Sequence, residues 1–212
     1  MYNMSAVAVN GTNHTLVAAQ NSTGWIKLVE ETATGWTVTP LASNGDNDSI
    51  SLAVTRQANG QSQPWIVYTD KQDDLWVVND TGNERQIVTG FVDEPSIATN
   101  NGTQLFVTYE NTSSNDIQLV KEEGCGWFGP ITLQSGTYSN PSTKFEFYNN
   151  YNASTILDYI FYEPGNKKVL YSNRTLDQSC TIETQNQFIF VGNVPERGSG
   201  VERLSPESIT LA

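Results

Sequence analysis

The stretch Ser51-Leu-Ala-Val-Thr55 is one copy of a short apolar segment that recurs along the chain. Similar segments begin at Ser5, Ser96 and Ser142, so the steps between them are 46, 45 and 46 residues. A constant period of about 20–50 residues is typical of repeat proteins, and about 40–50 residues is the length of a β-propeller blade. The spacing of these segments is therefore the feature that decides the fold.

Three further strands are expected after each of these starts. In the first unit they cover His14–Ala19, Trp25–Val29 and Trp36–Thr39. Gly, Asn and Thr interrupt every candidate helix, and no window keeps a helical period of apolar residues. Asn-Gly pairs such as Asn10-Gly11 supply the turns that antiparallel strands need. We therefore predict an all-β fold, a β-propeller built from four-stranded antiparallel blades.

The predicted propeller is a single domain that covers residues 1–212. Its repeat units are expected at residues 5–45, 46–90, 91–137 and 138–185, with a partial unit at residues 186–212. Phe188–Val191 has the pattern of another first strand, so we predict five blades, the last of them short. The N-terminal strand would complete the last blade and close the ring. Two alternatives stay open: a ring completed by another chain, and a β-sandwich.

The charge of the chain limits its partners. Its 212 residues include 23 acidic and 11 basic side chains, which give a net charge of −12. Scattered basic groups in this number cannot neutralise a row of phosphates, so nucleic acid and anionic membranes are excluded as partners. No apolar run reaches the ~18 residues that a membrane-spanning helix needs, so membrane insertion is not expected.

Asn-x-Ser/Thr sequons occur ten times, whereas about four are expected by chance from the Ser and Thr content. They begin at Asn3, Asn10, Asn13, Asn21, Asn47, Asn79, Asn101, Asn111, Asn152 and Asn173. The excess predicts a secreted, extracellular glycoprotein; a composition rich in Asn and Thr is the alternative explanation. Residues 1–10 lack the pattern of a signal peptide. If the protein is secreted, Met1 is therefore an internal residue of a processed precursor or an added start.

Cys125 and Cys180 lie at comparable phases of adjacent units. We predict that they form one disulfide, worth about 4 kcal/mol in the chain-entropy model; two unrelated buried thiols are the alternative. One histidine, His14, and two cysteines are too few for a structural zinc site, so no metal or cofactor is predicted. Calcium is a weaker hypothesis: Asp46 and Asp48, and the cluster Asp70, Asp73 and Asp74, offer hard oxygen ligands, but Asp46-Asn-Asp48 lacks the rest of an EF-hand loop.

The stretch from Val17 to Trp36 reads Val-Ala-Ala-Gln-Asn-Ser-Thr-Gly-Trp-Ile-Lys-Leu-Val-Glu-Glu-Thr-Ala-Thr-Gly-Trp. It resembles the blade repeat of fungal fucose-specific lectins, in which a strand of the type I-R-V-Y-Y-Q leads through a Gly turn to I-x-E and then G-x-W or G-W. Weaker copies are Ile66–Asp70, Phe106–Glu110 and Tyr159–Glu163, so the resemblance covers residues 5–185. It implies a propeller with a sugar site in each blade.

In that family each sugar is implied to be held by an Arg of the second strand and a Glu of the third, with aromatic rings against the sugar face. The Arg positions match Leu16, Trp65, Leu105 and Asp158, and the Glu positions match Leu28, Val77, Leu119 and Leu170 or Tyr171. Apolar side chains leave sugar hydroxyls unpaired, at about 1–3 kcal/mol for each buried group. Fucose binding at these positions is therefore not expected.

Aromatic residues next to polar ones are the remaining candidates for ligand binding. Trp25 and Trp76 share a phase at the start of the third strand, and Asp70, Asp73 and Asp74 precede Trp76. An exposed indole beside carboxylates suits the apolar face and the hydroxyls of a sugar. A solvated turn is the alternative for the acidic residues. Trp36 and Trp127 also recur in phase, and packing between blades explains them.

Three functions follow from these features. The favoured one is a secreted, glycosylated, non-enzymatic, lectin-like protein that recognises a glycan or an extracellular protein. The second is a glycoside hydrolase, which needs two carboxylates about 5–9.5 Å apart; its candidates are Asp93, Glu94, Glu146 and Asp158. A Ser-His-Asp triad would depend on the single His14 and is not expected. The third is a structural subunit that completes its ring with another chain. If that chain is a second copy, the protein is a homo-oligomer.

Overall fold

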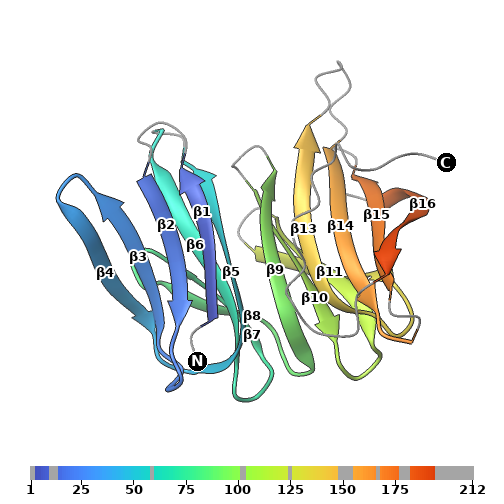
Figure 1. The fold of residues 1–212 in the computed structure, drawn as a ribbon, viewed down its shortest axis with the longest axis horizontal. Helices are drawn as coiled ribbons and strands as arrows, with labels where there is room; N and C mark the ends of the chain where they lie inside the picture. The colour runs from blue at the N-terminus through green and yellow to red at the C-terminus, as the bar shows by residue number, and fades with distance from the viewer. Residues whose placement is uncertain are drawn as a thin grey trace.

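The computed structural model describes residues 3–9, 14–57, 60–100, 104–123, 126–147, 155–165, 168–176 and 182–193. Regular structure in this part of the chain is entirely β (Figure 1). The strands are β1 (Asn3–Val9), β2 (His14–Gln20), β3 (Ile26–Thr32), β4 (Gly35–Ala42), β5 (Gly45–Arg56), β6 (Ser62–Asp70), β7 (Leu75–Asn79), β8 (Glu84–Val88), β9 (Val92–Asn100), β10 (Gln104–Asn111), β11 (Asp116–Glu123), β12 (Gly126–Gln134), β13 (Ser139–Phe147), β14 (Thr155–Glu163), β15 (Lys168–Leu176) and β16 (Ile182–Asn193).

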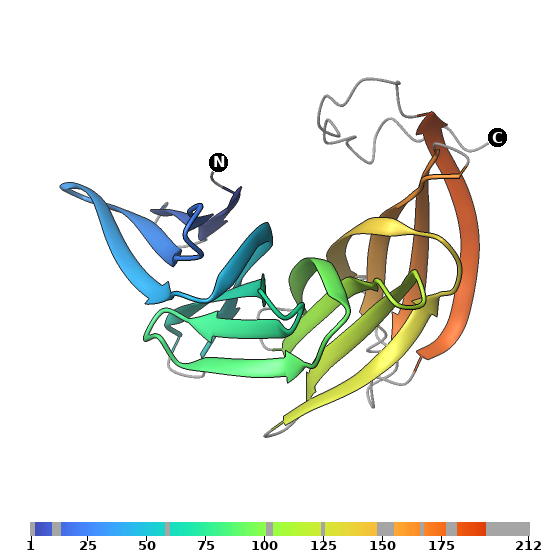
Figure 2. The same cartoon turned by 90° about the horizontal axis from the view of Figure 1, so that it is seen from below.

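These strands form four antiparallel sheets of four strands each, and every sheet takes its strands in chain order. We call the sheets β1–β4, β5–β8, β9–β12 and β13–β16 the first to fourth blades. The innermost strands β1, β5, β9 and β13 contact one another in sequence. Figure 2 shows the blades arranged in an arc around these strands. The prediction of an all-β fold with four-stranded antiparallel units is confirmed.

The repeating serine has a structural role between blades. The Ser51 hydroxyl of β5 accepts a hydrogen bond of 3.2 Å from the backbone N–H of Ile97 in β9. The partner lies 46 residues further along the chain, which is one repeat. The period seen in the sequence therefore reflects contact between successive innermost strands.

Each of the three junctions between blades contains its own apolar cluster. In a strand, alternate side chains point to opposite faces of the sheet, so each blade has a trailing face toward the next blade and a leading face toward the preceding one. At the first junction, Leu16 and Leu28 of the first blade's trailing face pack with Ile66, Tyr68 and Val78 of the second blade's leading face. The other two junctions repeat this arrangement.

The fourth blade differs from its prediction. β16 pairs with β15 along its length, with Leu170 opposite Phe190 and Tyr171 opposite Ile189. Phe188–Val191 therefore belongs to the fourth strand of the fourth blade, and its predicted role as the start of a fifth blade is wrong. β16 has 12 residues and β15 has 9, and three register shifts in the β15–β16 pairing accommodate the extra residues. Residues 194–212 lie outside the described residues, so the number of blades stays a prediction.

Three hairpin turns lie on the same side of the propeller, which we call the turn face. They join β2 to β3, β6 to β7 and β10 to β11, at the lower edge of Figure 1, and Figure 2 looks onto them. Each is closed by the side chain of its first residue, Asn21, Asp70 or Asn111, whose Oδ1 accepts hydrogen bonds from backbone N–H groups within the turn. Such Asx turns suit the short polar side chains of Asn and Asp.

Each of these turns also holds the next blade in place. Gly24, Asp73 and Asn115 have positive φ angles of 86°, 57° and 56°. Their carbonyl oxygens accept backbone hydrogen bonds from Gly45, Val92 and Tyr138, at 3.0, 3.0 and 3.3 Å, where the chain enters the next blade. At the first junction the approach is so close that a Cβ on Gly24 would overlap the Gly45 carbonyl. Glycine is the residue that tolerates both this contact and this φ angle.

Candidate functional site

The structure brings together two of the predicted ligand-binding residues, Asp70 and Trp76. The Trp76 Nε1–H donates a 2.8 Å hydrogen bond to Asp70 Oδ2. Asp70 Oδ1 accepts from the N–H groups of Gln72 and Asp74, at 2.9 and 3.0 Å. Because Asp70 is only 4% exposed, both of its oxygens serve the turn and the indole. Asp70 and Trp76 thus form an internal contact of the second blade.

Trp25 and Trp76 do not share a phase, so that part of the prediction is wrong. The Asn21 N–H donates to the Trp25 carbonyl, and the Asp70 N–H donates to the Asp74 carbonyl. Trp25 is therefore the counterpart of Asp74, two residues earlier than Trp76 in the repeat, and Lys27 is the counterpart of Trp76. Trp25 belongs to the turn before β3, whereas Trp76 lies inside β7.

Trp25 is an exception to a contact that the next two blades share. Asp74 Oδ1 accepts a 2.6 Å hydrogen bond from the Gly90 N–H, and Asp116 Oδ1 accepts a 3.1 Å bond from the Gly136 N–H. In both blades this aspartate fixes the connection to the following blade. The first blade has an indole at this position, and Trp25 is 44% exposed on the turn face. A structural aspartate is thus replaced by an exposed aromatic ring.

Phe91 is a second exposed aromatic residue, and it was not recognised from the sequence. It is 59% exposed and lies between β8 and β9. Its φ angle is 62°, which is uncommon for a bulky residue and is found where surrounding contacts impose it. Two hydrogen bonds hold the segment here. The Phe91 carbonyl accepts a 2.9 Å bond from the Thr112 N–H, and the neighbouring Val92 N–H donates to the Asp73 carbonyl. Phe91 thus lies on the turn face where the second and third blades meet.

Carboxylates surround the Phe91 segment. Asp73, whose carbonyl holds Val92, is exposed. Asp74 bonds Gly90, the residue before Phe91, and also accepts a 2.6 Å bond from Gln86 Nε2. At the first junction the residue that corresponds to Phe91 is Asn44, because Gly45 and Val92 make the equivalent backbone bonds. The Asn44 Oδ1 accepts a 2.9 Å bond from the Tyr68 hydroxyl. An aromatic ring with neighbouring carboxylates is therefore a property of the second junction.

Two other carboxylates face each other across strands β9 and β10. Asp93 and Glu110 are direct partners in the antiparallel register. Burial, and secondarily the charge of Asp93, raises the pKa of the Glu110 carboxyl above its ordinary value of 4.5. This pair was not recognised from the sequence, although Asp93 was named as a candidate. Of the other hydrolase candidates, Glu94 follows Asp93 in β9, whereas the side chains of Glu146 and Asp158 lie outside the described residues.

A pH-dependent stability is expected from Glu110. A folded-state pKa that is raised favours the protonated carboxyl, so its contribution to stability is present below about pH 4.5 and is lost as pH rises through the folded-state pKa. Glu110→Gln is expected to gain stability relative to wild type as pH increases from 4 to 7. Urea unfolding at several pH values measures this difference. A difference that is constant with pH would contradict the prediction.

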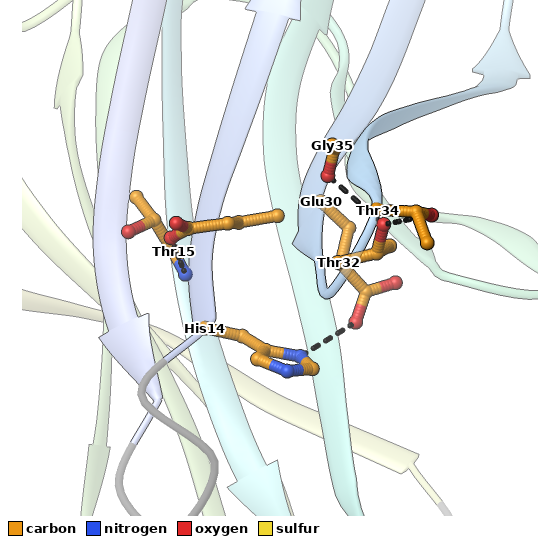
Figure 3. Close-up of polar contacts among 7 residues, drawn as sticks. His14, Thr15, Glu30, Thr32, Thr34 and Gly35 are labelled. Atoms are coloured by element: carbon orange, nitrogen blue, oxygen red, sulfur yellow. Dashed lines mark hydrogen bonds and ion pairs between the residues drawn. The ribbon is translucent and has the colours of Figure 1, made fainter.

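His14 lies at the surface of the first blade. Its Nδ1 is 3.7 Å from Glu30 Oε1, and both side chains are more than a third exposed (Figure 3). Beside this pair the Thr15 N–H donates to Glu31 at 3.2 Å, and the Thr32 hydroxyl donates to the Gly35 carbonyl at 2.9 Å. These contacts organise the ends of β2 and β3.

In the first three blades the positions of the implied fucose clamps lie at the apolar junctions between blades. Leu16 and Leu28 are 3% and 5% exposed in the first of these cores. In the third blade the register corrects the assignment: Thr69 lies opposite Leu75 and Glu110 opposite Ile117, so Phe106, and not Leu105, corresponds to Trp65. In the fourth blade Tyr171 pairs with Ile160 and is the counterpart of the clamp Glu, in preference to Leu170.

Several other predictions meet the structure only in part. Cys125 and Cys180 lie outside the described residues, so their disulfide stays a prediction. Among the sequon asparagines with described side chains, Asn79 is 5% exposed, and its Oδ1 accepts bonds from the N–H and hydroxyl of Thr81. The Asp46 carboxylate accepts a 3.1 Å bond from the Thr69 hydroxyl, and the side chain of Asp48 is not described.

The described part of the chain contains no group of three or more His, Cys, Asp and Glu side chains placed to hold a metal ion. It also contains no helix that is long and apolar enough to span a membrane.

The arrangement of blades is shared with solved structures. The Aleuria aurantia lectin, described as a six-bladed β-propeller with a novel fucose recognition mode, has a TM-score of 0.66 and 10% identity, with 91% of this chain and 62% of that chain covered. The chain folds as a β-propeller. AofleA from Arthrobotrys oligospora matches this propeller with a TM-score of 0.64 and 14% identity, covering 92% of this chain and 58% of its own.

A third match is the SapL1 lectin in complex with α-methyl fucoside, with a TM-score of 0.59 and 11% identity over 88% of the propeller and 65% of that lectin. The propeller thus spans less than two thirds of the length of these proteins. Their fold confirms the resemblance to fungal fucose-specific lectins. No protein-family model and no curated protein matches the sequence.

Proposed function

We propose that this propeller is a non-enzymatic carbohydrate-binding protein that contacts its ligand through aromatic rings on the turn face. The observation that carries the proposal is the exposure of Trp25 where the next two blades have a structural aspartate. Such a replacement removes a bond that stabilises the fold and presents an indole to solvent. Phe91 provides a second ring at the next junction.

The chemistry of these rings fits a sugar. Aromatic faces pack against the C–H groups of a pyranose, and nearby carboxylates accept hydrogen bonds from its hydroxyls. The Asp74 carboxylate, which holds Gly90 next to Phe91, keeps further lone pairs for such hydroxyls, and the Asp73 side chain is exposed. Two of the similar propellers are called lectins, one described by its fucose recognition and one in complex with a fucoside. In this chain no implied clamp position has the Arg or the Glu, so the proposed ligand is held elsewhere and is not selected by those clamps.

We also propose that the protein acts outside the cell and carries N-linked glycans. The support is the excess of sequons, of which Asn21 and Asn111 keep partly exposed side chains. An extracellular protein that carries a glycan would be an equally suitable partner, because the rings would contact the same sugar. Binding is proposed to need no cofactor, and addition of EDTA or calcium to the binding assay tests this.

A glycan array with purified protein tests the proposed function. Wild-type protein is expected to bind a defined set of neutral glycans, and Trp25→Ala or Phe91→Ala is expected to weaken that binding about tenfold, equivalent to about 1.4 kcal/mol. Phe128→Ala is the matched control, since Phe128 is 52% exposed but lies on β12. Absence of binding across the array, or equal binding by all four proteins, would overturn the proposal.

Glycoside hydrolysis is the second candidate function, and the Asp93–Glu110 pair favours it. A carboxyl with a raised pKa beside a second carboxylate is the arrangement of a general acid and its partner. Turnover of aryl glycosides that disappears in Glu110→Gln would establish it. The non-enzymatic proposal expects no turnover by the wild-type protein.

A further inference from the structure

The leading face of the first blade carries an apolar row, which Lys27 and Glu31 flank on β3, and it has no neighbouring blade in the described part of the chain. It contains Val17, Val29 and Val38, which form one row across β2, β3 and β4. Ile66 and Val78 correspond to Val17 and Val29 in the second blade, where both are 0% exposed. In the first blade Val17 and Val29 are partly exposed, and Val38 is 54% exposed.

The trailing face of the fourth blade is the uncovered face at the other end of the arc, in the described part of the chain. Ile160 and Tyr171 lie directly opposite each other on this face, and Val169 is beside them. Val67 and Val77 correspond to Ile160 and Tyr171 in the second blade and are 0% and 2% exposed. In the fourth blade all three side chains are partly exposed.

We propose that the two faces bind each other between copies of this chain, so that the fourth blade of one copy packs on the first blade of another. The chain itself builds this kind of interface three times, each time from an apolar trailing face and an apolar leading face. The two remaining faces carry the same positions of the repeat and the same type of residue. A second copy is therefore the occupant whose surface matches both.

The outer strand β4 supports this assignment. Val38 has the position that Glu84 has in the second blade, because Val29 pairs with Val38 and Val78 pairs with Glu84. Next along the same face, Trp36 is 57% exposed. The first blade thus extends its apolar face to the sheet edge, where the second blade has a charge. Exposed apolar patches of this kind mark interaction surfaces.

Head-to-tail contacts between different faces form a ring when the rotation closes. Two copies related by a twofold axis would make two identical interfaces of this type. Such a ring also covers the exposed sheets at both ends of the arc.

Light scattering coupled to size-exclusion chromatography tests the proposal on the full chain. The wild-type protein is expected to have the mass of two chains, and Val38→Lys is expected to reduce it to one. Thr39→Lys is the matched control: Thr39 is the next residue, is also exposed, and lies on the opposite face of β4. Because both positions are exposed, both variants are expected to keep the wild-type circular dichroism spectrum.

The outcomes separate clearly. Any assembly that dissociates in Val38→Lys and persists in Thr39→Lys supports the interface. A wild-type protein that is monomeric at all concentrations, or an assembly that Val38→Lys leaves intact, overturns it. Val169→Lys on the fourth blade provides an independent check, since it should give the same loss of mass as Val38→Lys.

Discussion

Replacement of Asp70 by alanine is expected to lower the free energy of unfolding by about 3–5 kcal/mol. Its carboxylate accepts three hydrogen bonds, two from backbone N–H groups of the turn and one from the Trp76 indole. The residue is 4% exposed, so water does not readily replace it, and each unpaired buried donor costs about 1–3 kcal/mol. Urea unfolding followed by tryptophan fluorescence measures the change.

Asp70→Asn separates the two roles of this side chain. Asn21 and Asn111 close the equivalent turns with an amide oxygen, so the turn is expected to persist in this variant. Only the bond to Trp76 Nε1 loses its acceptor, and the loss is expected to be about 1–2 kcal/mol. Equal destabilisation by Asn and Ala would show that the indole bond, and not the turn, dominates.

Replacement of Leu28 by glutamate is expected to destabilise the propeller by at least about 3 kcal/mol. This substitution introduces the residue that the resemblance to fucose-specific lectins implies at this position. Leu28 is 5% exposed and packs in the cluster of the first junction. A carboxylate there would lose its hydration without a partner, and the apolar contacts of leucine would be lost as well. Thermal unfolding and a fucose titration are the measurements.

Thr39→Glu is the control for this experiment. Thr39 lies directly opposite Leu28 in the β3–β4 register and is exposed. The same charge at this position is expected to change stability by no more than about 0.5 kcal/mol. A Leu28→Glu protein with wild-type stability, or one that gains fucose binding, would contradict the interpretation that the clamp positions have become core.

The blade architecture could be predicted because its spacing is a physical contact. The recurring serine that begins each unit accepts a bond from the next innermost strand in the case of Ser51, so the repeat in sequence and the repeat in space coincide. The Asx residues gave similarly direct signals for turns. Conversely, β16 was predicted incorrectly because its polar centre, Gln185–Gln187, interrupts the apolar pattern by which strands were recognised.

The candidate site was less predictable, because single-residue shifts decide which side chains meet. The turn of the third blade has one residue more than that of the second, counted from the Asx residue to Asp116 or Asp74, the aspartate that bonds the connection to the next blade. The sequence pattern does not reveal this shift, and Leu105 was therefore aligned in place of Phe106. Phe91 was missed for another reason: it belongs to a connection, where no periodicity distinguishes an exposed ring from a buried one.

The Asx turns give the Asn-x-Ser/Thr pattern two competing uses. As the first residue of a turn, Asn79 keeps its side-chain oxygen bonded to Thr81 and Asn83 and is 5% exposed. As a glycan acceptor, the same side chain would have to project its nitrogen into solvent with a bulky sugar attached. In the folded chain the Asn79 side chain closes the turn, so a glycan on it would require these bonds to open. Part of the sequon excess is thus accounted for by backbone geometry, and the number of sequons overstates the number of sugars the folded propeller has room to carry.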